Sequence, residues 1–167
     1  IKLVNWIGMY TLLSKEIKRF CKVYQQTILA PAFTAMLFFF VITVAISSKV
    51  QHEFNYSNFL APGLIIMSMM QNAFANTSSS LLGSKMQGNI VDLLMPPLNA
   101  NEIIVSYILA AVIRSIFIGL LTFILIFPFT ELVLKSIFTL ITYVILGSVF
   151  LALLGLIAGI WAEKFDN

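Results

Sequence analysis

The sequence has little of what most enzymes and secreted domains depend on. Its 167 residues include one cysteine, Cys21, and one histidine, His52. A disulfide framework, a zinc site of cysteines and histidines, and a histidine-based catalytic triad are therefore excluded within this chain. No glycine-rich loop ends in Lys-Ser or Lys-Thr, so we expect no ATP to bind through a P-loop of its own. We predict that the chain itself binds no cofactor and no metal.

Charge is also scarce. Only 10% of the residues are Asp, Glu, Lys or Arg, whereas soluble domains have about 25%, and 60% of the residues are hydrophobic. A soluble domain of this length would have to expose much of that apolar surface to water. Because the apolar residues come in long blocks, the chain is predicted to be an all-α membrane protein. Its positive residues gather near one end instead of forming a surface stripe, so no nucleic acid partner is expected.

An amphipathic helix is predicted over residues 3–26. Its apolar residues recur at steps of three and four, which places them on one face. They are Trp6, Tyr10, Leu13, Ile17, Phe20 and Tyr24. The basic residues Lys15, Lys18, Arg19 and Lys22 fall elsewhere on the helix. This pattern is typical of a helix that lies among lipid headgroups. The alternative is a helix that packs against a soluble partner.

Four apolar segments are each long enough to cross the roughly 30 Å of a bilayer's hydrocarbon. These predicted spans are residues 28–48, 59–82, 103–127 and 137–161. The segment between the second and third spans, residues 83–102, is too polar to cross and is predicted to be a loop. Within that loop, residues 88–95 have the composition of a short helix that the Pro96-Pro97 pair would stop.

The distribution of Lys and Arg predicts the orientation of the spans. Five precede the first span, and the 83–102 loop and the tail add one each, which gives seven on one side. The other side has only Lys49 and Lys135. We therefore predict that the amino terminus, the 83–102 loop and the tail face the cytoplasm.

Polar residues inside the predicted spans are candidates for a functional role. In the second span, Ser68, Asn72, Asn76 and Ser79 share one narrow stripe, with Gln71 beside it. The stripe could line a substrate path, but helix packing through side-chain hydrogen bonds is the favoured interpretation. Arg114 is the ionisable residue well inside a span. It could lie in the protein interior, or it could reach the headgroups if its helix starts deeper in the cytoplasm.

Two further features concern packing and catalysis. Gly155 and Gly159 form a small-xxx-small pair in the fourth span, which favours close approach of another helix. All seven acidic residues lie outside the predicted spans, so no pair of carboxylates is expected to meet within the bilayer. A membrane-embedded enzyme is disfavoured for this reason, and no ring of charged residues indicates a channel.

The run from Phe59 to Leu98, FLAPGLIIMSMMQNAFANTSSSLLGSKMQGNIVDLLMPPL, resembles the permease subunits of type-2 ABC transporters. The resemblance extends over essentially the whole chain and is most specific at residues 83–97. It implies a bacterial inner-membrane exporter subunit that works as a homodimer in membrane lipid, with ATP and Mg on a separate ABC ATPase. Members of the family usually have six spans, so the chain is expected to be a fragment that lacks the last two.

In such permeases the cytoplasmic segment after the second span couples to the ATPase. Carried over to this sequence, the resemblance implies an ATPase contact formed by Lys85, Gly88, Asn89, Ile90, Val91, Asp92, Leu93 and Leu94. The alternative for this segment is an ordinary amphipathic loop on the membrane surface. For the whole chain, the alternative is a structural or assembly protein of the membrane that transports nothing. The cargo cannot be read from four apolar spans, because such permeases move polysaccharides, lipid-linked sugars and drugs.

Overall fold

The computed structural model describes residues 5–47, 56–130 and 137–162, and in these ranges the chain is almost entirely helical. The elements, in order, are α1 (Trp6–Lys22), the π-helix η1 (Gln25–Leu29), α2 (Ala30–Ser47), α3 (Tyr56–Met86), α4 (Ile90–Leu94), α5 (Ala100–Ile126), the short 3-10 helix η2 (Phe127–Phe129) and α6 (Ile137–Trp161). The described residues therefore form an all-α fold, as the sequence predicts.

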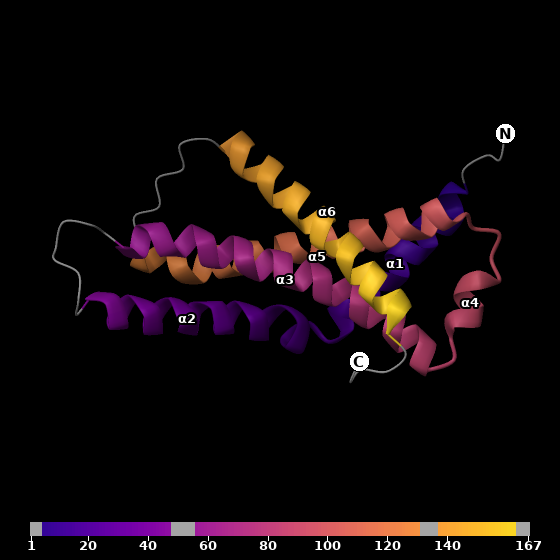
Figure 1. Ribbon diagram of the computed structural model, residues 1–167, viewed down its shortest axis with the longest axis horizontal. Coiled ribbons are helices and arrows are strands. Elements are labelled where there is room, and N and C mark those ends of the chain that lie inside the picture. Colours follow the sequence, from indigo (N-terminus) through magenta and orange to yellow (C-terminus); the bar gives the residue numbers. More distant parts are fainter. Residues whose placement is uncertain (1–4, 48–55, 131–136, 163–167) are drawn as a thin grey trace.

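Helix α3 is the centre of the bundle (Figure 1). It is the longest helix, with 31 residues, and it packs against α6, α5 and α2. Helix α2 runs along one side of α3, whereas α6 crosses it at an angle and diverges from it toward the start of α6. The start of α1, α4 and the end of α6 all lie toward the same end of the molecule.

Three described segments are long and apolar enough to cross a membrane: Gln25–Ile46, Ala100–Phe129 and Phe138–Trp161. These correspond to the first, third and fourth predicted spans. Helix α3 corresponds to the second, but its carboxy-terminal half is too polar to satisfy the same criterion. That half lies against other helices, and Asn72, Asn76 and Thr77 are buried there. Crossing of the membrane by α3 stays a prediction.

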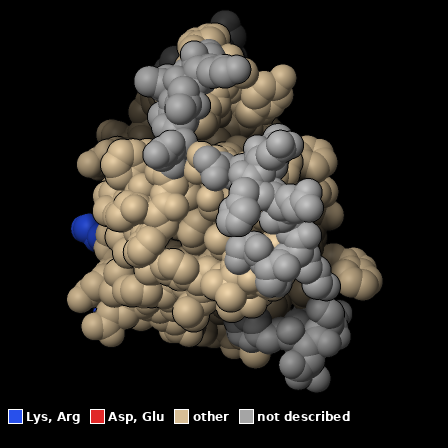
Figure 2. Space-filling view, turned by 90° about the vertical axis from the view of Figure 1, so that its left-hand side faces the viewer, with Lys and Arg blue, Asp and Glu red and all other residues tan. Residues whose placement is uncertain are grey.

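Charged residues in the described part of the chain are confined to a few places. Apart from Arg114, they lie in α1, at the end of α3, in α4 or in the first turn of α5. Figure 2 views the opposite end of the molecule, and its described surface is almost entirely uncharged. The predicted orientation relies partly on Lys2, Lys49, Lys135 and Lys164, which lie outside the described residues.

The 83–102 loop is shorter than the sequence analysis predicted. Helix α3 continues to Met86, and α5 begins at Ala100 rather than at residue 103. The early start of α5 has a local cause, because Asn99 and Glu102 form a capping box in which each side chain accepts from the other residue's backbone N–H. The expected short helix is present as α4, which follows Gly88 at a φ of 73°. Glycine adopts that left-handed conformation with little strain.

The buried face of α1 differs from the predicted apolar face. Leu12, Glu16 and Phe20 are the buried residues, whereas Trp6 and Tyr10 are 69% and 71% exposed. Helix α1 packs against α5, and the side of α1 that faces α5 is next to the predicted apolar face. The exposed Trp6 and Tyr10 stay available to the lipid headgroup region, where such aromatic side chains are enriched. The interfacial position of α1 stays a prediction.

Candidate functional site

A polar cluster lies inside the bundle where α1, α3 and α5 meet. Its centre is Arg114, which is 7% exposed. Arg114 lies about 21 Å along α5 from the first residue of that helix. The guanidinium donates from Nη1 to Asn76 Oδ1 at 3.2 Å and from Nη2 to Asn72 Oδ1 at 3.2 Å. Both asparagines lie on α3, one turn apart, so they present their amide oxygens to the same side. The Arg114 side chain is thus held in the interior of the protein rather than reaching the headgroups.

Helix α1 contributes Glu16 and Arg19 to this cluster. Glu16 is 2% exposed; its carboxylate lies 3.3 Å from Arg19 Nη2 and accepts from Ser80 Oγ at 2.6 Å. Arg19 Nη2 also donates to the backbone carbonyl of Asn76 at 3.3 Å and to Asn76 Oδ1 at 3.4 Å. Asn76 therefore receives hydrogen bonds from arginines on two different helices.

The junction between α1 and α2 is tied to the same cluster. Arg114 Nη2 donates to the backbone carbonyl of Thr27, in the π-helix, at 3.3 Å. In an α-helix this carbonyl would accept from the residue four positions later, which is Pro31, and proline has no N–H to donate. The Thr27 hydroxyl turns back to the Phe20 and Val23 carbonyls at 2.9 and 3.0 Å. Arg114 thus joins α5, α3 and the start of the first span.

The other members of the predicted polar stripe lie outside the cluster. Ser68 is buried, but its hydroxyl donates to Ile65 O within α3. Ser79 is half-buried and likewise donates to Ala75 O. Gln71 is exposed on another side of the helix. The structure brings Asn72, Asn76 and Arg114 together and leaves Ser68, Ser79 and Gln71 apart. Passage of a substrate along the stripe stays a prediction.

Two members of the cluster were not candidates in the sequence analysis. The helical period places Arg19 away from the apolar face of an interfacial helix and gives Glu16 no role, yet Arg19 contacts Asn76 and Glu16 contacts Ser80. Their i, i+3 spacing permits an ion pair within one turn, which was the available signal. Sequence alone gives no hint that α3 provides a polar surface opposite this pair.

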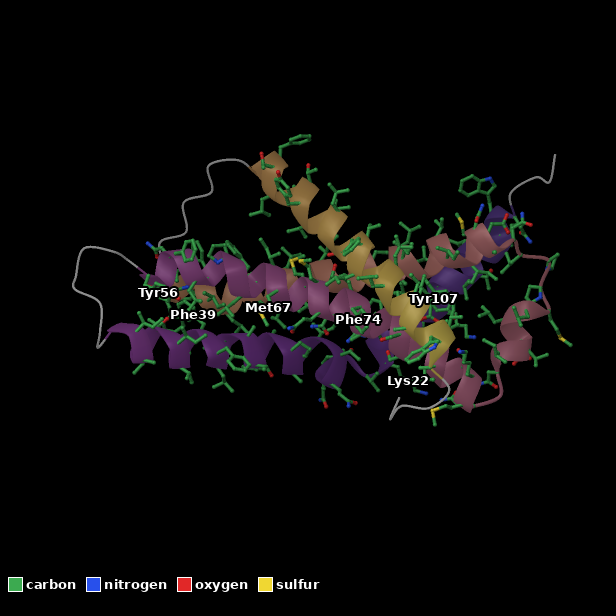
Figure 3. The ribbon with its side chains drawn as sticks, in the orientation of Figure 1. Lys22, Phe39, Tyr56, Met67, Phe74 and Tyr107 are labelled. Atoms are coloured by element: carbon green, nitrogen blue, oxygen red, sulfur yellow. The ribbon has the colours of Figure 1, made fainter. Side chains whose placement is uncertain are left out.

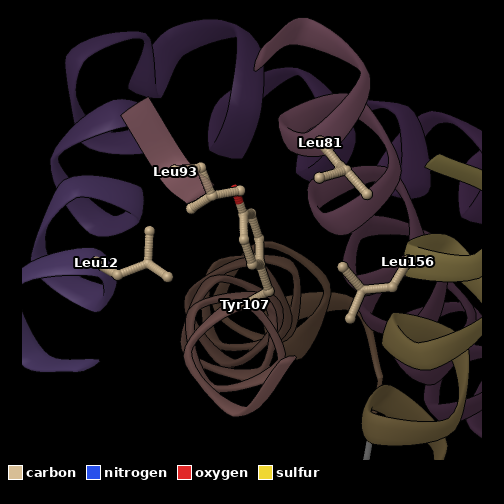
Figure 4. Close-up of a cluster of buried hydrophobic side chains, with 5 residues drawn as sticks. All are labelled: Leu12, Leu81, Leu93, Tyr107 and Leu156. Carbon is tan, nitrogen blue, oxygen red and sulfur yellow. The ribbon is translucent and has the colours of Figure 1, made fainter. Parts of the chain in front are cut away.

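Helix α4 is attached to the bundle by one buried side chain. Leu93 is 5% exposed and lies in a cluster with Leu12 of α1, Leu81 of α3, Tyr107 of α5 and Leu156 of α6 (Figure 4). Figure 3 shows Tyr107 and Lys22 toward this end of the molecule and Phe39 and Tyr56 toward the other. Five helices therefore meet around the Tyr107 ring.

The rest of α4 and its flanks face outward. Val91, Leu94 and Met95 are 53%, 68% and 77% exposed, and Asp92, Gly88 and Asn89 are exposed as well. Ile90 is partly buried against the Leu93 cluster. The Leu93 side chain packs inward and is not exposed for a partner to contact. The assignment of this segment to an ATPase contact, with Gly88, Asn89, Val91, Asp92 and Leu94 as its exposed residues, stays a prediction.

Lys85 also has a different position from the one expected. Its ammonium group donates to the backbone carbonyls of Ile160 and Ala162, the latter at 3.1 Å. These carbonyls belong to the last turn of α6 and the residue after it, where a helix lacks partners for its C=O groups and favours a positive charge. Lys85 thus binds the end of α6 in the structure, and its contact with an ATPase stays a prediction.

We expect Lys85→Met to destabilise the protein by about 0.5–1 kcal/mol, because the α6 carbonyls lose their charged donor. The measurement is thermal unfolding of the detergent-purified protein. Lys18→Met, which removes an exposed lysine from α1, is the control and should leave the midpoint unchanged. A loss of partner binding by Lys85→Met without any loss of stability would contradict this position.

Comparison with known proteins gives one consistent result. Residues 8–167 match the profile described as "ABC-2 type transporter". The chain is also 36% identical over 165 residues to the protein named "Inner membrane transport permease YadH" of Escherichia coli K12, and the same values hold for the YadH proteins of E. coli O157:H7 and Shigella flexneri. The alignment covers 97% of this chain and 64% of those relatives. No solved structure gives a significant match.

Proposed function

Because this chain belongs to the ABC-2 type transporter family, we propose that it is a permease subunit of an ATP-driven exporter in the bacterial inner membrane, coupled to a separate ATPase through α4. The observation that carries this proposal is the two-sided character of α4. One side chain, Leu93, is embedded among four other helices, while Val91, Asp92, Leu94 and Met95 face outward.

Such a helix can transmit displacement. A partner that holds the exposed side of α4 and moves would move Leu93 with it, and Leu93 belongs to a buried cluster that also includes side chains from α1, α3, α5 and α6. Protein interiors are close-packed, so a shift at this point changes the packing of several helices at once. The proposed mechanism is alternating access, in which two ATPase subunits close on ATP and the helix bundles rock. The chain contributes the transmission, and the ATPase contributes the hydrolysis.

A second copy of the permease completes the proposed transporter. Large apolar side chains such as Phe38, Leu37 and Val41 of α2 are more than half exposed, which suits either lipid or a neighbouring subunit. We propose a homodimer with a substrate path between the two copies. The amino terminus and α4 would face the cytoplasm, since α1 and α4 lie toward the end that carries most of the described charge.

Replacing Asp92 with lysine tests the ATPase contact. Asp92 is exposed on α4, so the charge reversal should leave membrane insertion and folding intact while weakening ATPase binding at least tenfold, or about 1.4 kcal/mol. The measurement is recovery of the ATPase with tagged, full-length permease in detergent. Asn101→Lys adds positive charge in the first turn of α5 and is the control. Equal recovery of the ATPase by Asp92→Lys and by the parent protein would reject this contact.

A further inference from the structure

The polar cluster around Arg114 contains more positive than negative charge. It holds two guanidinium groups, Arg19 and Arg114, and one carboxylate, Glu16. Among the described residues, the ion pair with an N to O distance within 4 Å is the one between Arg19 and Glu16. Arg114 is bound by amide and carbonyl oxygens, which are neutral. Arg19 is paired with Glu16 and its side chain is 37% exposed. The surplus positive charge is therefore that of Arg114, which is 7% exposed, and an uncompensated charge is costly in a low-dielectric interior.

The same cluster contains hydrogen-bond donors that no described group satisfies. They are Arg19 Nε, Arg114 Nε and Asn76 Nδ2, and all three atoms are buried. Asn76 is 0% exposed and Arg114 is 7% exposed. Asn76 directs its oxygen to both arginines, so its amide nitrogen is left without an acceptor. An unsatisfied buried donor destabilises the folded protein, and more so when it is charged, so three in one cluster call for an acceptor.

We propose that this cluster is a binding site for a small inorganic anion of the size of chloride, held by Arg19, Arg114 and Asn76. An anion would accept from the donors and cancel the surplus charge at once. Water could accept hydrogen bonds but would leave the charge uncompensated. The site is independent of the ATPase contact, because it lies inside the bundle and none of its residues belongs to α4. Its occupancy would hold α1, α3 and α5 together.

Asn76→Asp is the decisive variant. The substitution keeps the side-chain shape, replaces the unsatisfied NH₂ group by a second acceptor, and supplies a permanent negative charge between the two arginines. It should therefore take over the role of the bound anion. Asn89→Asp makes the same chemical change at an exposed position before α4 and is the matched control.

The experiment uses the full-length protein in detergent and compares sodium chloride with sodium gluconate at equal ionic strength. For the parent protein and Asn89→Asp, chloride should raise the thermal midpoint by about 3 °C or more with saturation, and dialysis against ³⁶Cl⁻ should give one bound chloride per chain. Asn76→Asp should bind no chloride and should have in gluconate the midpoint that the parent reaches in chloride.

Three results would overturn the proposal. The first is an equal midpoint of the parent protein in chloride and in gluconate. The second is chloride binding by the Asn76→Asp variant, measured on protein that elutes as a folded species in size-exclusion chromatography. The third is unfolding of Asn76→Asp in both salts, since a carboxylate between two arginines should stabilise the site.

Discussion

Replacement of Gly155 by alanine is expected to destabilise the helix bundle by about 1–3 kcal/mol, the usual cost of forcing extra volume into a packed interior. A Cβ atom at this position would come within 2.5 Å of the Phe74 backbone oxygen and would also collide with Thr77 Oγ1. Backbone cannot yield as a flexible side chain does. The Thr77 hydroxyl donates to the Ala152 carbonyl at 2.9 Å across the same contact, so the collision would also disturb an interhelical hydrogen bond.

The test is the thermal midpoint in detergent, together with the fraction of protein that elutes as a single species. Gly63→Ala is the matched control, because a Cβ at Gly63 on α3 meets nothing within 4 Å. That variant should be as stable as the parent protein. If Gly155→Ala and Gly63→Ala had the same midpoint, the close approach of α6 to α3 would be refuted. Gly155→Leu should prevent recovery of folded protein.

The second large effect is expected at Leu93. Leu93→Ala should destabilise the protein by about 2–4 kcal/mol, because it removes buried methyl groups and leaves a cavity beside Tyr107. Leu94→Ala, at the next position, should leave stability within about 0.5 kcal/mol of the parent, since Leu94 is 68% exposed. The adjacent pair therefore separates the anchor of α4 from its outward surface.

Stability and ATPase recovery must be measured on both variants. Leu94→Ala should lower ATPase recovery at an unchanged midpoint, and Leu93→Ala should lower the midpoint. Similar loss of stability in both variants would mean that α4 lies flat against the bundle, and the two-sided arrangement would then be wrong.

The helical architecture could be predicted because hydropathy and length dominate it. The apolar blocks place α2, α5 and α6 to within a few residues, and the short helix α4 ends before the Pro96-Pro97 pair, as predicted. The start of α5 was missed by three residues, because Asn99 and Glu102 were counted as polar loop residues rather than as a capping box. The close approach of α6 to another helix was predicted from Gly155 and Gly159 and is confirmed, with Thr77 and Phe74 facing Gly155.

The polar cluster was only half predictable. The 3.6-residue period places Asn72 and Asn76 on one side of α3, and a lone arginine inside an apolar block draws attention to Arg114. Which helices those residues face depends on tertiary packing, which no period reveals. For the same reason the sequence does not reveal that Glu16 and Arg19 contact α3, or that Leu93 packs inward. On a helix of five residues, the packing of the surrounding helices decides which side chains point inward, and the sequence of the short helix does not.

The carboxylate of Glu102 serves the beginnings of two helices. One oxygen accepts from the Asn99 backbone N–H and the other from that of Asn5, both at 2.8 Å. Asn5 precedes Glu102 by 97 positions. During synthesis, α1 therefore leaves the ribosome long before its capping partner exists. Its final attachment must wait until the segment that begins with α5 has been made, so α1 is synthesised before α5 but can be fixed in place only after it.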